Sequence, residues 1–134
     1  MKRIIKNSAI VLSLILLVLV AMIFRPIMNL EPKDCGKLTG EIITLKAHQG
    51  SKDITFRVKG DQRRFYINRG LEQGLIEEEL IEATTNTKSL IYYADHWTPL
   101  DPKSIVRHVA HIEVDGTALF SEFKENPTLS STYP

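Results

Sequence analysis

Cysteine is almost absent from this chain, since Cys35 is the single cysteine among 134 residues. One thiol cannot form an intramolecular disulfide, so the fold must be stable without one. Cys35 is therefore expected to be a free thiol or half of an intermolecular bridge. Lipidation is not expected, because Glu31, Pro32, Lys33 and Asp34 stand where a lipobox has small apolar residues.

Acidic residues are absent from the first thirty positions. Four of the 17 Lys/Arg residues lie there, whereas all 16 Asp/Glu residues lie from Glu31 onward. The remaining 13 cations leave the rest of the chain with a net charge of −3. A domain with this balance is not a general polyanion binder, so any anion site has to be local.

Motifs of enzyme and metal chemistry are missing as well. The chain has no G-x-x-x-x-G-K-[ST] phosphate loop, and no nucleophile elbow accompanies Asp95, His96 and Ser104. His108 and His111 are three apart in a predicted strand, which should place them on opposite faces and prevent them from chelating one ion. We therefore expect no enzymatic activity, no metal and no cofactor.

One long apolar run is present, over residues 8–24, and it contains no charge. A helix over 4–24 would span roughly 30 Å, the thickness of the hydrocarbon core of a bilayer. The cations before this run favour an N-terminus inside the cytoplasm. We therefore predict a single-pass anchor in the lipid bilayer over residues 1–30, with the C-terminal domain outside the cytoplasmic membrane, in the periplasm or extracellular. A cleaved signal peptide is the alternative, although bulky residues end the run where cleavage needs small ones.

Proline, serine and threonine mark the segments on either side of the predicted folded domain. Residues 31–36 contain Pro32 and charges, which predicts a short stalk. Residues 124–134 are rich in Ser, Thr and Pro, which predicts a flexible tail. The folded domain is therefore expected over residues 37–123.

Side chains alternate along residues 53–70 as they do in a two-stranded hairpin. Gly60-Asp61 supplies turn chemistry between the strands. One face is apolar and carries Ile54, Phe56, Val58, Phe65 and Ile67. The opposite face, which we call the basic face, carries Arg57, Lys59, Arg64 and Tyr66, and Arg63 and Arg69 are expected at its ends.

The other elements follow from periodicity and turn signals. Strands are expected over 37–47, 88–95, 104–114 and 117–122, and a helix is expected over 71–85. Gly40 predicts a bulge or a sharp bend in the first strand. Gly74 is expected near the start of the helix, whose glutamates predict a solvated face. Asp115-Gly116 is a hairpin signal.

Three strands, a helix and further strands in this order resemble the OB-fold, a five-stranded barrel with a helix between strands three and four. The predicted fold is mainly β with one short helix: an OB-like barrel of five to six strands, preceded by an N-terminal transmembrane helix. An SH3-like barrel is the alternative. The stretch from Phe65 to Gly70, with Trp97-Thr98-Pro99, also resembles small membrane-anchored bacterial proteins of unknown function. That resemblance implies a location and no activity.

Two binding surfaces are predicted. OB-folds bind ligands on the face of strands two and three, which points to Arg57, Lys59, Arg64 and Tyr66 as ligand-binding residues. Outside the cytoplasm an acidic protein, a glycan or lipid headgroups are the expected ligands, and nucleic acid is not. An ordinary solvated face is the alternative. Trp97 is the candidate contact for a protein partner, because aromatic residues dominate interface hot spots, and the alternative is that it caps the barrel end.

The predicted function is a membrane-anchored extracytoplasmic binding or scaffolding module that has no catalytic activity. Its partner would be a protein of the membrane or envelope, in an envelope, secretion or toxin-protection assembly. The alternative is an OB-type domain whose basic face binds an anionic ligand.

Overall fold

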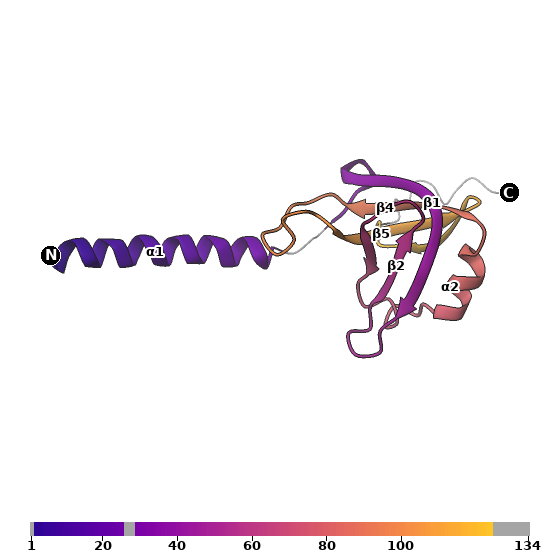
Figure 1. Cartoon of the computed structure of the whole chain (residues 1–134), viewed down its shortest axis with the longest axis horizontal. Coiled ribbons are helices and arrows are strands. Elements are labelled where there is room, and N and C mark those ends of the chain that lie inside the picture. The colour runs from indigo at the N-terminus through magenta and orange to yellow at the C-terminus, as the bar shows by residue number, and fades with distance from the viewer. Residues whose placement is uncertain (1, 26–28, 125–134) are drawn as a thin grey trace.

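The computed structural model describes residues 2–25 and 29–124, with side chains from residue 7 on. It comprises an N-terminal helix and a β-barrel (Figure 1). The predicted tail from residue 125 on lies outside the described residues. The elements are α1 (Lys2–Ile23), the 3-10 helix η1 (Pro32–Asp34), β1 (Cys35–Ala47), β2 (Ile54–Val58), β3 (Arg64–Ile67), α2 (Glu77–Thr84), β4 (Lys88–Ala94), β5 (Val106–Val114) and β6 (Thr117–Ser121).

Five strands close into a mixed barrel. Antiparallel pairs join β1 to β2 and β4, β2 to β3, and β4 to β5. A parallel pair between β3 and β5 closes the barrel, with Arg64 opposite Val106 and Tyr66 opposite His108. The helix α2 lies between β3 and β4 in the chain, and β6 is an additional strand on β5. This topology is consistent with the expected OB-like barrel.

The inner faces of the strands form the core. The rings of Phe56 and Phe65 stack with their centroids 5.6 Å apart, and both side chains are almost fully buried. The core also contains Ile54, Val58, Ile67, Ile91, Val109 and Ile112. The alternation seen in residues 53–70 therefore predicted correctly which hairpin side chains face the core.

β1 is long enough to belong to both halves of the barrel, and Figure 1 shows its curvature. It pairs with β4 up to Glu41 and with β2 from Ile42 onward. Gly40 lies at this change of partner, where a Cβ atom would be 2.5 Å from Cγ1 of Val58. The irregularity in the β1–β2 ladder falls later, between Ile43 and Lys46. The irregularity in β1 therefore does not lie at Gly40, where the strand changes partner and Val58 approaches closely, and the sharp bend stays a prediction.

The helix is shorter than expected. Residues 71–76 form turns and α2 begins at Glu77, because Gly74 takes a positive φ of 85° that interrupts a right-handed helix. Leu75 still packs against the core, but the predicted apolar position Ile76 is 48% exposed. Glu77 also departs from the predicted solvated face, since its carboxylate accepts a hydrogen bond from the backbone N–H of Ala47 at 2.9 Å.

A bulge in β5 overturns the prediction that His108 and His111 point to opposite faces. Tyr92 pairs with His111 and Tyr93 with Val109, so Ala110 is an extra residue in the ladder. Because of this insertion the side chains three residues apart share a face, and both histidines lie on the outside of the barrel.

α1 extends away from the barrel (Figure 1). Its large apolar side chains between Ile10 and Met22 are 42% to 68% exposed, and they occur all around the helix. Within the described residues, no helix meets the length and hydropathy required to identify a membrane span. The anchor therefore remains a prediction.

Candidate functional site

The basic face lies on the outside of β2 and β3, as the alternation requires. Arg57 lies near the end of β2, Lys59 directly follows that strand, and Arg64 and Tyr66 come from β3. Arg57, Lys59 and Arg64 are exposed, while Tyr66 is half-buried. The structure thus brings the four predicted residues onto one surface.

Two arginines face each other across this surface. Thr55 pairs with Tyr66 and Phe56 with Phe65, so the next pair in the register is Arg57 opposite Arg64. Like charges in directly opposed positions destabilise a sheet. Neither guanidinium has a hydrogen bond or an ion pair with any of the residues that the structure describes. The pair is therefore a local concentration of positive charge that no side chain among the described residues neutralises.

Lys59 is less available to bind an anionic ligand than Arg57 and Arg64, because it already has an ion-pair partner. Its ammonium lies 3.6 Å from a carboxylate oxygen of Glu41 on β1. The lysine side chain is 73% exposed, so this ion pair contributes little to stability. Lys59 can still turn towards a ligand, but it carries its own counterion.

Tyr66 is turned towards a neighbour and is a poor stacking platform. Its ring meets the ring of His108 edge-on, with centroids 5.4 Å apart. Burial raises the pKa of the Tyr66 phenol, and the negative charges of Asp53 and Glu122 raise it further. The hydroxyl therefore stays protonated, and the surroundings of Tyr66 are more acidic than the sequence suggested.

Arg63 points into the end of the barrel and not onto the basic face. Its guanidinium holds both carboxylate oxygens of Asp61, at 2.7 to 3.2 Å, and donates to the Tyr93 hydroxyl at 2.9 Å. These hydrogen bonds lower the pKa of Asp61 and raise that of Arg63. Arg107 also lies within 5.6 Å of the Tyr93 ring centre. Arg63 and Arg107 therefore both pack against Tyr93 at this end of the barrel.

The β5 bulge creates an outer cluster that the sequence did not reveal. Nε2 of His108 lies 2.7 Å from a carboxylate oxygen of Glu122, and the His111 ring stacks on Phe123 at 5.4 Å. The carbonyl of Ala110, freed by the bulge, accepts the backbone N–H of Glu122 at 2.8 Å. Glu122 and Phe123, which follow β6, therefore pack against the outer side of β5. No sequence signal marks a bulge at Ala110, so this cluster could not be anticipated.

Trp97 lies in the β4–β5 loop, residues 95–105. It is 57% exposed, which does not fit a cap over the barrel end. Its indole N–H donates to the Pro102 carbonyl at 3.3 Å. A cavity of about 600 Å³ separates this loop from the end of α1. Its lining includes Met22, Ile23, Arg25, Tyr66, Trp97 and Leu100.

Cys35 is the first residue of β1, opposite Ala94 of β4. Burial raises the pKa of its thiol, and the neighbouring charge of Asp34 adds to the effect. Since the thiolate is the reactive form, this cysteine is a weak nucleophile.

The loop residues Asp95 and His96 contact Arg107 of β5. Asp95 is ion-paired with Arg107 at 3.3 Å, and the His96 carbonyl accepts from the same guanidinium. Over residues 2–25 and 29–124, no three His, Cys, Asp or Glu side chains converge where a metal ion could bind.

Comparisons of this chain with protein-family models, with curated proteins and with solved structures gave no match. They add no support for the resemblance to small membrane-anchored bacterial proteins, which remains a prediction. The OB-like description rests on the barrel topology.

Proposed function

We propose that this protein is a membrane-anchored binding module without catalytic activity, whose barrel lies outside the cytoplasm. The observation that carries the proposal is α1, which projects from the barrel with exposed apolar side chains on all sides. A helix of this kind is stable when lipid covers it, because all its backbone groups are satisfied internally. The basic residues at its start favour an N-terminus inside the cytoplasm.

The anchor predicts that the full chain stays in bacterial membranes after an alkaline carbonate wash. Leu14→Arg combined with Val18→Arg is expected to release it, because each charge at a helix centre costs about 2.5–3.5 kcal/mol on insertion. Ile81→Arg, which adds a charge to the exposed side of α2, is the control and should leave the chain in the membrane. Release of the unaltered chain would contradict the anchor.

The side of the membrane is tested separately. In a Cys35→Ser chain, Gln49→Cys places a thiol in the exposed loop between β1 and β2. A membrane-impermeant maleimide should label this thiol on intact spheroplasts. Labelling that requires lysis would place the barrel in the cytoplasm.

A second candidate function is recognition of an anionic ligand by the basic face. It is favoured by Arg57 and Arg64, which stand opposite each other with no neutralising side chain among the described residues. An anionic group between them would form charge-assisted hydrogen bonds and relieve their repulsion. An acidic protein segment and a sulfated glycan both have this chemistry.

Replacing both arginines tests the second candidate. Arg57→Gln with Arg64→Gln is expected to weaken binding of a polyglutamate peptide or a sulfated glycan about tenfold, which corresponds to about 1.4 kcal/mol. Lys88→Gln with Lys124→Gln removes the same charge from exposed positions off the basic face and serves as the control. Calorimetric titration of both variants gives the comparison. Equal losses in the two would show general charge attraction and no site.

A further inference from the structure

The β4–β5 loop presents the most exposed large apolar side chains of the described barrel. Leu100 is 73% exposed and Trp97 is 57% exposed, whereas other such residues of the barrel reach at most 48%. Tryptophan and leucine at a loop tip are costly to leave in water. Covering this tip is therefore favourable.

The tip is held in its exposed form. Thr98 and Asp101 form an isolated bridge, and the Asp101 carboxylate accepts the backbone N–H of Val106 at 2.6 Å. The Asp101 carbonyl accepts the N–H of Ser104 at 2.9 Å, and the indole of Trp97 is bonded to the Pro102 carbonyl. These bonds keep Trp97 from folding back, so little ordering is required on binding.

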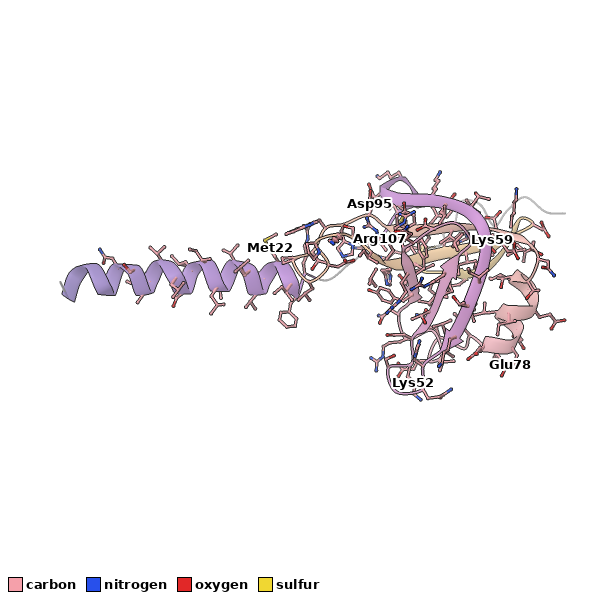
Figure 2. All side chains as sticks on the ribbon, viewed as in Figure 1. Met22, Lys52, Lys59, Glu78, Asp95 and Arg107 are labelled. Atoms are coloured by element: carbon pink, nitrogen blue, oxygen red, sulfur yellow. The ribbon has the colours of Figure 1, made fainter. Side chains whose placement is uncertain are left out.

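The position of the tip identifies the covering surface. Trp97 and Leu100 line one cavity together with Met22, Ile23 and Arg25, which form the end of α1 and the residues after it. Figures 1 and 2 show the loop reaching towards this end of α1, where Met22 is labelled. If α1 spans the bilayer, its apolar stretch ends at this level. The loop tip then stands at the boundary between lipid and water.

We propose that the tip of the β4–β5 loop is a second, interfacial membrane contact, in which Trp97 and Leu100 enter the headgroup region beside α1. The inference rests on the proposed anchor. Tryptophan concentrates at this depth of the bilayer because its ring is apolar and its N–H is polar. Arg25, which shares the cavity, would reach the lipid phosphates. Attachment at two points fixes the tilt of the barrel on the membrane.

Trp97 is the single tryptophan of the chain, so tryptophan emission, excited at wavelengths that tyrosine does not absorb, reports on this loop alone. The experiment uses the full chain reconstituted into vesicles of phosphatidylcholine and phosphatidylglycerol. Lipids brominated near the headgroup should quench the emission strongly, and lipids brominated near the chain ends should quench little, because tryptophan concentrates at headgroup depth. Leu100→Asp should reduce the quenching, whereas Ile81→Asp, on exposed α2, should not.

Vesicle flotation of the same samples separates the two proposals. A chain that floats and whose Trp97 is quenched by the shallow bromines supports the interfacial contact. A chain that floats but whose Trp97 is unquenched overturns the contact and leaves the anchor standing. In that case, accessibility to iodide would show an exposed loop, and protection from iodide would show that the chain itself covers Trp97. A chain that does not float overturns both proposals. Unchanged quenching in Leu100→Asp also counts against insertion of the tip.

Discussion

Phe65→Ala is expected to lower the free energy of unfolding by about 3–5 kcal/mol, the cost of removing a buried aromatic side chain. The ring is fully buried and stacks on Phe56, and its second neighbour, Tyr93, meets it edge-on at 5.7 Å. The surrounding strands are joined into a closed ladder, so they can collapse only partly around the cavity. The loss is a large fraction of the stability of a small domain.

Arg64→Ala is the matched control, because it truncates the next side chain of the same strand on the opposite face. It should change the free energy of unfolding by no more than about 0.5 kcal/mol. Urea unfolding of both variants, followed by circular dichroism, measures the difference. Similar losses for the two would contradict the assignment of Phe65 to the core.

Gly36→Ala is expected to destabilise the barrel by about 1–3 kcal/mol, although it adds a single methyl group. Gly36 is paired with Tyr93, and a Cβ atom there would lie 2.3 Å from Cζ of that ring. The ring cannot simply swing away, because its hydroxyl is held by Arg63. Either the cross-strand contact or the hydrogen bond has to shift.

A double-mutant cycle identifies the cause of this loss. In a Tyr93→Ala background the ring is gone, and Gly36→Ala should then cost much less than in the unaltered chain. Gly50→Ala is the glycine control, since nothing lies within 4 Å of its Cβ position. Thermal unfolding of these chains measures the coupling. An unchanged cost in the Tyr93→Ala background would exclude the ring as the source.

The basic face shows how far strand periodicity can locate a candidate site. Alternation along residues 53–70 correctly placed Arg57 and Arg64 outside and Phe65 inside, because the pleat fixes the face of each side chain. It could not give the environment of Tyr66, which depends on His108 of a distant strand. Nor could it show that the Arg63 guanidinium donates hydrogen bonds to Asp61 and Tyr93.

The sequence by itself determined the order of the elements along the chain, the inward side chains of the hairpin over residues 53–70, the position of α2 between β3 and β4, and the hairpin turn at Asp115-Gly116. These features depend on interactions between residues that are close in the sequence, so the local pattern of apolar, polar and turn residues predicts them. The tertiary structure alone decided that β3 closes on β5, where β1 is irregular, and that a bulge at Ala110 brings His108 and His111 to one face. It also brought Leu100 and Trp97 beside the end of α1. Such features depend on which distant strands meet, and barrel closure imposes them without leaving a local pattern.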